Sequence, residues 1–160
     1  MNIDTKEKSE GRRYPRSPIP AVGAVVVKGR DVLLIVRGND PGRGRWSIPG
    51  GAILLGESLE QAVVREITEE VNIVVEPVGL VKAVDRIVRD EEGHIIYHYI
   101  LMDFLCLYRS GNLRAASDAT KARWVRESDI ERYDLPEETR EVIRKGLEMA
   151  MSHDKNQNAK

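Results

Sequence analysis

The sequence predicts an α/β protein in which helices cover both faces of a mixed β-sheet. Two observations support this prediction. Apolar, β-branched runs of strand length alternate along the chain with two amphipathic segments of helical period. The first of those helical segments follows directly on a glycine-rich stretch, Pro49-Gly50-Gly51. At 160 residues the chain is long enough for one domain with a substantial core.

The composition excludes several classes of function. With a net charge of −1 and 32% charged residues, the chain lacks the basic excess that holds nucleic acid or a membrane surface. No apolar run reaches the length of a membrane span, and no signal peptide precedes the first strand. The single cysteine, Cys106, cannot form an internal disulfide. We therefore expect a cytoplasmic protein with no membrane or nucleic-acid partner.

The chain divides into three parts. Residues 1–17 are polar and rich in arginine and proline, and we expect a flexible N-terminal tail. Residues 18–151 hold the alternating apolar pattern and form the predicted domain. Residues 152–160 are predicted to be a disordered C-terminal tail.

The first half of the domain reads as strands that lead into a loop. Residues 19–28 and 31–37 are apolar runs separated by Gly29-Arg30, which predicts a β-hairpin in the core. A glycine-rich loop occupies residues 38–45. Residues 46–48 form a short strand that delivers the chain to Pro49 and the two glycines.

A helix is predicted from Leu59 to about Val71. Ser58 precedes it and Gln61 stands three residues on, which is the pattern of a capping box. At 100° per residue the apolar side chains gather on one face, as in an amphipathic helix packed on a sheet. These side chains are Leu59, Val63, Val64, Ile67 and Val71.

The second half returns to strands and ends in a helix. Residues 74–88 and 95–108 predict a long antiparallel hairpin in the middle of the sheet. A short strand at residues 123–126 follows, and Ser128 is expected to cap a brief helix. Residues 136–151 predict a final amphipathic helix that Pro136 opens.

Three acids of the first helix lie where a solvated face does not belong. Glu66, Glu69 and Glu70 span an arc that adjoins the apolar face rather than opposing it. Carboxylates about 6 Å apart repel by roughly 3 kcal/mol per pair at an effective dielectric of about 20. A divalent cation offsets that repulsion, and all-oxygen ligands favour Mg²⁺ first and Mn²⁺ second. Arg65 precedes Glu69 by four residues, so a salt bridge can orient that carboxylate.

The glycine loop and the helix together resemble the Nudix box, G-x5-E-x7-R-E-U-x-E-E-x-G-U, where U is aliphatic. From Gly51 the chain matches this pattern through Glu57 to Ile73 at every fixed position except one. Asn72 stands where the family has glycine. We expect a left-handed residue there, a conformation that asparagine tolerates better than most. The resemblance implies the Nudix fold, an α/β/α sandwich with a mixed sheet, over residues 18–150.

The resemblance also implies a magnesium-dependent pyrophosphohydrolase that cleaves a nucleoside diphosphate linked to another moiety. Glu66, Glu69 and Glu70 are then the catalytic metal ligands, with the Gly51 carbonyl as a further ligand and Glu57 acting through water. The general base is open between Glu66 and an acid on a later loop, for which Asp118 is the candidate. A plain turn aspartate is the alternative for Asp118.

Candidate substrate contacts lie outside the box. Arg37, Arg43 and Arg45 surround the glycine loop and are candidates for binding phosphate, although surface solubility also explains them. Tyr97 or Tyr99, which share one face of a strand, could stack on a base, and Tyr97 is the candidate; core packing with a hydrogen-bonded hydroxyl is the alternative. The arginines of the tail, Arg12 among them, could approach an anionic ligand or stay solvated.

The substrate is less determined than the reaction. The size of the chain and its opening segment resemble small bacterial and archaeal ADP-ribose pyrophosphatases, which release AMP and ribose 5-phosphate. Many such enzymes carry a proline beyond the box where this chain has Arg89. A MutT-like nucleoside triphosphate pyrophosphohydrolase that clears damaged nucleotides is the alternative, and a nucleotide sensor without catalysis is a third. The resemblance also allows a homodimer.

Overall fold

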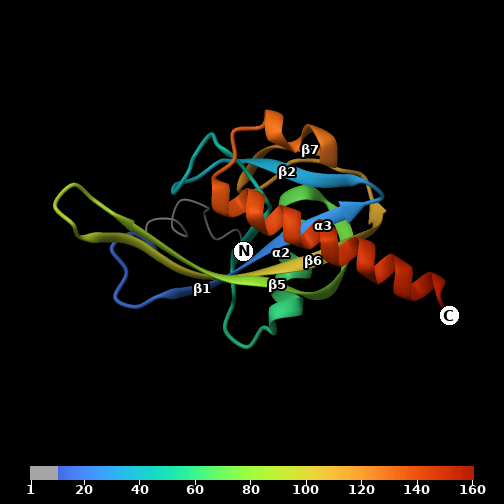
Figure 1. Ribbon diagram of the computed structural model, residues 1–160. Coiled ribbons are helices and arrows are strands. Elements are labelled where there is room, and N and C mark those ends of the chain that lie inside the picture. The colour runs from blue at the N-terminus through green and yellow to red at the C-terminus, as the bar shows by residue number, and fades with distance from the viewer. Residues whose placement is uncertain (1–10) are drawn as a thin grey trace.

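The computed structural model describes residues 11–160, and these form one seven-stranded mixed sheet with helices on both sides (Figure 1). The sheet path is β3-β2-β1-β6-β5, with β4 beside β1 and β7 beside β2. The elements in chain order are β1 (Ile19–Lys28), β2 (Asp31–Arg37), β3 (Trp46–Ser47), β4 (Gly50–Ala52), α2 (Leu59–Val71), β5 (Ile73–Arg89), β6 (Ile95–Gly111), β7 (Ala119–Arg126), the 3₁₀-helix η1 (Glu127–Arg132) and α3 (Glu137–Asn158).

The sheet is mixed because its central pair is parallel. β1 runs parallel to β6 from Ile19 opposite Tyr99 to Val27 opposite Leu107. The pairs β1–β2, β1–β4 and β5–β6 are all antiparallel. The far end of the β5–β6 hairpin projects beyond the helices as a long arm (Figure 1). The predicted hairpins are therefore both present.

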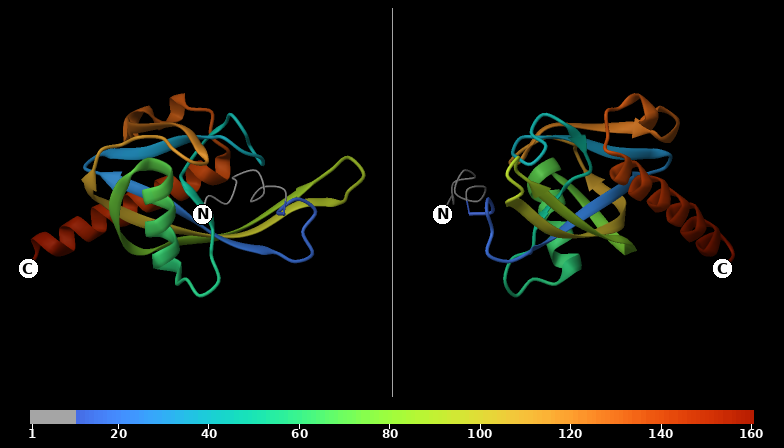
Figure 2. Two further views of the ribbon diagram at one scale, coloured as in Figure 1. Left: turned by 180° about the vertical axis from the view of Figure 1, so that it is seen from behind. Right: turned by 60° about the vertical axis from the view of Figure 1, so that its left-hand side comes forward.

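The two main helices lie on opposite faces of the sheet (Figures 1 and 2). The side chains of β1 alternate between these faces, as the pleat requires. Val22 and Val26 pack toward α2, whereas Val25 and Val27 pack toward α3. This arrangement confirms the predicted α/β/α sandwich and explains why β1 is apolar at successive positions.

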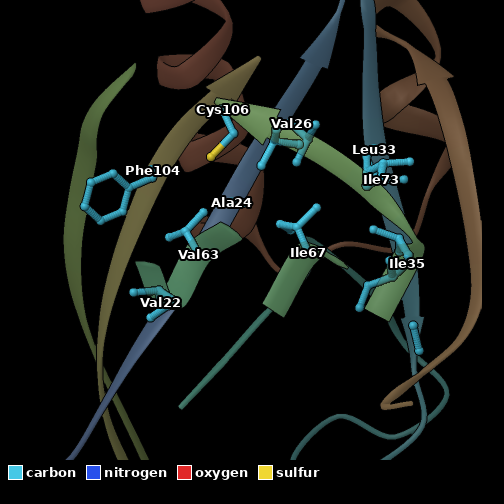
Figure 3. Close-up of a cluster of buried hydrophobic side chains, with 14 residues drawn as sticks. Val22, Ala24, Val26, Leu33, Ile35, Val63, Ile67, Ile73, Phe104 and Cys106 are labelled. Atoms are coloured by element: carbon cyan, nitrogen blue, oxygen red, sulfur yellow. The ribbon is translucent and has the colours of Figure 1, made fainter. Parts of the chain in front are cut away.

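The core beneath α2 joins the helix to five strands, β1, β2, β5, β6 and β7, and Figure 3 shows part of it. Its members are Val22, Ala24, Val26, Leu33, Ile35, Ala62, Val63, Ile67, Val71, Ile73, Val75, Phe104, Cys106 and Ala119. Cys106 is fully buried there, and burial raises the pKa of its thiol to about 12, so this cysteine packs as an apolar residue.

The second core lies beneath α3. This helix crosses β1 closely at Gly146, where any side chain would press against Val25. Val142, Ile143 and Ala150 lie on the buried side of the helix. None of the helices in the described range is long and apolar enough to cross a membrane.

Three expectations about the ends of elements are wrong. The last helix continues past Met151 to Asn158, because the segment after Met151 contains no glycine or proline to stop it. The predicted disorder of residues 152–160 is corrected accordingly. Arg126, not Ser128, precedes η1, and no side chain caps that turn. The strand predicted at residues 123–126 begins earlier, at Ala119.

Two expectations about arrangement also need correction. Only β6 of the long hairpin lies inside the sheet, since β5 forms its edge. Residues 11–17 belong to the predicted flexible tail, yet they lie against the hairpin, where the Tyr14 amide donates to the Ile96 carbonyl at 2.8 Å. Residues 1–10 of that tail lie outside the described range.

Candidate active site

The helix that carries the acids is fixed at both ends. At its start the Gln61 amide donates to Ser58 Oγ at 3.1 Å and the Ser58 amide donates to Gln61 Oε1 at 2.9 Å, which completes the predicted capping box. At its end Asn72 has φ 60° and ψ 33°, the left-handed conformation expected where the family has glycine. The helix bounds match the prediction at both ends, so the positions of the acids follow from the sequence.

The two glycines bring the backbone of β4 against this helix. Gly51 lies opposite Val22 of β1, and a Cβ on Gly51 would overlap the Glu66 carboxylate. The amide of Gly50 donates to Glu70 Oε2 at 3.1 Å. Only glycine at these positions allows strand and carboxylates to meet so closely.

Glu66 and Glu70 form a buried acidic pair, with 8% and 2% of their surfaces exposed. Burial raises the pKa of both carboxyls, and that of Glu70 reaches about 8 because the charge of Glu66 adds to the effect. Two adjacent carboxylates withdrawn from water favour a positive charge beside them.

Arg65 supplies a positive charge to three of the four acids. Its Nε lies 2.5 Å from Glu57 Oε1, and its Nη1 lies 2.7 Å from Glu66 Oε1 and 3.3 Å from Glu69 Oε2. The contact with Glu57 lowers the pKa of that carboxyl. The expected Arg65–Glu69 salt bridge is present, although Glu57 and Glu66 are nearer. Arg65 therefore holds the acids in fixed orientations.

The donor set fits a hard divalent ion. Carboxylate oxygens and the nearby backbone of Gly51 are the ligands that Mg²⁺ and Mn²⁺ prefer. Among the described residues, however, no three His, Cys, Asp or Glu side chains are already arranged around one ion position. Three of the acids point to Arg65 instead, and Glu70 points to the Gly50 amide. The assignment of Gly51, Glu57, Glu66, Glu69 and Glu70 as ligands stays a prediction.

A cavity adjoins the acidic pair. Glu70, Gly50 and Gly51 form part of its wall. Asp118 also lines it, and its charge contributes to the raised pKa of Glu66 and Glu70. Asn39 Nδ2 donates to Asp118 Oδ1 at 2.8 Å. The loop before β7 thus places Asp118 in the same cavity as Glu70, and its role as general base stays a prediction.

The arginines of the cavity differ in part from those expected. Arg37 lines it as predicted, with its Nε donating to the Pro41 carbonyl at 2.7 Å. Arg86 and Arg12 line it as well. Burial and the nearby charge of Arg37 lower the pKa of Arg86. Sequence analysis did not identify Arg86. Whether its side chain reaches the cavity depends on where the β5–β6 hairpin lies in the fold, which the sequence does not show.

The predictions for Arg43 and Arg45 are not supported by their positions. Neither is among the residues that line the cavity. Arg43 is exposed, and Arg45 Nη2 lies 3.7 Å from Asp134 Oδ1. Both side chains point away from the cavity, although the backbone stays close to β2, because the Arg37 amide donates to the Arg45 carbonyl at 3.0 Å. Surface solubility, the alternative considered for these two residues, accounts for them.

The aromatic wall of the cavity is Tyr99 rather than the predicted Tyr97. The two rings are stacked, with centroids 6.3 Å apart and an interplanar angle of 15°. Tyr99 lines the cavity, whereas Tyr97 is buried and not among the lining residues. Side chains two apart on a strand share a face, so sequence alone could not choose between them.

Sequence reasoning also missed Asp103. This residue of β6 is buried and lines the same cavity as Glu70. The available signal was an acidic residue inside the longest apolar run of the chain.

Comparisons with known proteins agree with this geometry. The NUDIX domain family matches residues 17–146. An ADP-ribose pyrophosphatase of Methanocaldococcus jannaschii is 36% identical over 107 residues, covering 67% of this chain and 61% of that protein. The chain thus spans about three fifths of the length of this curated relative.

Solved structures share the fold. A MutT NUDIX hydrolase from Burkholderia pseudomallei has a TM-score of 0.69 and 30% identity, covering 81% of this chain and 98% of that one. The NUDIX domain of Shewanella oneidensis NrtR, solved with ADP ribose, has a TM-score of 0.66 over 93% of this chain and 94% of its own. At 24% identity, that second likeness concerns the fold alone.

Proposed function

This chain belongs to the NUDIX domain family, and from that premise we propose that it is a divalent-metal-dependent pyrophosphohydrolase whose preferred substrate is ADP-ribose. One observation carries the proposal. A single cavity is lined by Glu70, which is buried next to Glu66, and by the cationic and aromatic side chains of Arg37, Arg86 and Tyr99. That combination fits a diphosphate bonded to a nucleoside.

The proposed mechanism assigns a task to each group of residues. A bound Mg²⁺ would neutralise phosphate oxygens and favour ionisation of the attacking water. Glu66, Glu69 and Glu70 would hold the ion with the Gly51 carbonyl, and Arg65 would keep their carboxylates oriented. Arg37 and Arg86 would bind diphosphate oxygens that face away from the acids.

The proton of the attacking water needs an acceptor. Glu66 and Asp118 are the two candidates, since both lie beside Glu70 and both affect its pKa. The hydrogen bond from Asn39 Nδ2 to Asp118 Oδ1 supports Asp118 for this role, because it orients the carboxylate. Its other oxygen accepts no hydrogen bond from a described side chain, which leaves it available to water.

The choice of ADP-ribose rests on the archaeal relative that carries that name, at 36% identity. A MutT-like nucleoside triphosphate pyrophosphohydrolase is the second candidate. The Burkholderia structure, at 30% identity and 98% coverage of its chain, favours that alternative.

The test is a hydrolysis screen with Mg²⁺, in which products are separated by chromatography. The panel contains ADP-ribose, NADH, diadenosine polyphosphates, the normal nucleoside triphosphates and 8-oxo-dGTP. AMP plus ribose 5-phosphate from ADP-ribose is the expected result. Pyrophosphate plus a nucleoside monophosphate would move the protein to the triphosphate class. Binding of ADP-ribose without cleavage of any compound would overturn the enzymatic proposal in favour of a sensor.

A further inference from the structure

Asp103 is a buried acid for which residues 11–160 supply no hydrogen-bond or ion-pair partner. Only 5% of its surface is exposed, and its remaining accessible area belongs to the cavity wall. Within residues 11–160, no side chain or backbone amide is seen to donate a hydrogen bond to the Asp103 carboxylate. No Lys, Arg or His nitrogen of these residues lies within 4.0 Å of it, and the Lys82 amine pairs with Glu141 instead. No described buried side-chain oxygen is both shielded from solvent and unpaired, so the Asp103 carboxylate is reached through the cavity. An acceptor with no donor from the described chain is free to bind a donor on a ligand.

The surroundings of Asp103 hold it in this position. Gly23 lies opposite it on the parallel neighbour β1, and a Cβ on Gly23 would overlap Asp103 Oδ1. The charges that face it are Glu138 of α3 and Lys82 of β5, and the Lys82 amine lies 3.2 Å from Glu141 instead. Burial, with the charge of Glu138, raises the pKa of Asp103 to about 6, so the carboxyl is ionised at pH 7.5. It is then an acceptor only.

The walls around this carboxylate are apolar. Val84, Leu101 and Val142 line the cavity together with Asp103, and they come from β5, β6 and α3. A planar heterocycle packs well against aliphatic side chains, whereas a sugar ring with several hydroxyls would leave most of them without partners. The chemistry of this part of the cavity is thus that of a base with one hydrogen-bond donor on its edge.

We propose that Asp103 is a specificity-determining residue, and that its carboxylate accepts a hydrogen bond from the exocyclic amino group of the substrate's base. This inference rests on the proposed function, since it names the feature of the nucleotide that the same cavity selects. Adenine meets the requirement through its 6-amino group. Unsubstituted purine, which has no N–H donor on its edge, leaves the carboxylate unpaired and is bound less well.

The test compares ADP-ribose with its analogue in which hydrogen replaces the 6-amino group of adenine. At pH 7.5 we expect wild-type kcat/KM to favour ADP-ribose by roughly 10-fold or more, the value of one hydrogen bond to a charged group. Asp103→Ala should reduce this ratio to near 1. Asp103→Asn should restore part of it, because the amide oxygen still accepts. Asp85→Asn, which changes an exposed acid of β5, is the matched control and should keep the wild-type ratio.

Two results would overturn the proposal. One is a wild-type ratio that Asp103→Ala leaves unchanged. In the other, the wild type prefers ADP-ribose to its 2′-deoxy or 3′-deoxy analogue and Asp103→Ala loses that preference instead. This result would assign the carboxylate to a ribose hydroxyl.

Binding measurements separate this proposal from the proposed function. Titration calorimetry with AMP and with purine riboside 5′-monophosphate needs no hydrolysis. A preference for AMP that requires Asp103 supports the inference even if no diphosphate is cleaved. If ADP-ribose is hydrolysed but neither the kinetic comparison nor the calorimetry shows a preference for the 6-amino group, the proposed function stands. The role proposed for Asp103 is then overturned.

Discussion

Two kinds of buried carboxylate lie at the cavity or next to its wall, and their environments differ. Glu66 is buried beside a guanidinium of its own chain, with Arg65 Nη1 at 2.7 Å. Asp103 is buried to a similar degree, yet no cation of the described chain contacts it. Asp103 lines the cavity in which a substrate would lie, and Glu66 lies against Gly51 of the cavity wall.

This difference separates two functions of buried charge. The acids of α2 have partners within the chain, namely Arg65 and the Gly50 amide, which keep their carboxylates next to one another. Asp103 is placed by shape alone, in the space that Gly23 leaves. A preorganised cluster suits catalysis, whereas a carboxylate left without a partner suits recognition of a donor that arrives with the ligand.

The largest effect is expected from Glu70→Gln, which removes a charge from the preorganised cluster. It keeps the shape of the side chain, so kcat should fall by at least about 10²-fold while the fold is retained. The thermal shift that Mg²⁺ produces in the wild type should shrink in parallel. Glu60→Gln, which changes an exposed acid in the first turn of the same helix, is the control. Turnover near that of the wild type would remove Glu70 from the metal ligands.

Asp103→Asn should change stability rather than turnover chemistry. Its pKa of about 6 in the folded protein exceeds the ordinary value near 3.9, so the folded state binds the proton more tightly between about pH 4 and pH 6. Stability therefore falls as pH rises through that window, and the ionised carboxylate costs roughly 2 to 3 kcal/mol above it. Asparagine has no such dependence.

Urea unfolding at two pH values measures this effect. We expect Asp103→Asn to match the wild type near pH 4 and to exceed it in free energy of unfolding by roughly 2 kcal/mol at pH 8. Glu66 and Glu70 titrate in both proteins, so their contributions cancel in the difference. A constant difference at both pH values would show that Asp103 is not the titrating group.

The two regions also differ in how far sequence could predict them. The helix, its cap and its left-handed end follow from local patterns, namely Ser58 with Gln61 and an asparagine at the position of a glycine. The contact between Glu57 and Arg65 depends on the path of the loop and helix between them. The sequence indicates it only through the resemblance to the Nudix box. Asp103 and Arg86 reach the cavity through strand register and hairpin twist, which local spacing does not encode.

A smaller effect is expected from Arg65→Lys, which weakens the preorganisation without removing the charge. One ammonium cannot replace a fork that contacts Glu57, Glu66 and Glu69 together. We expect kcat to fall by roughly 10-fold and the Mg²⁺ concentration for half-maximal activity to rise, with KM for the nucleotide little changed. Arg109→Lys alters an exposed ion pair with Glu76 and should leave all three values unchanged. A change confined to KM would place Arg65 in substrate binding instead.

The smallest effect concerns Asn72, which ends the helix that carries the acids. Glycine would relieve the left-handed backbone by about 0.5 to 1 kcal/mol. It would also remove the hydrogen bond from Asn72 Nδ2 to the Asn112 carbonyl at 3.0 Å, of similar value. Urea unfolding should therefore place Asn72→Gly within about 0.5 kcal/mol of the wild type, and Asn72→Ala about 1 to 2 kcal/mol below it. A full 1 kcal/mol gain for glycine would mean that the contact with Asn112 adds nothing, and that this chain departs from the family's glycine at a net cost in stability.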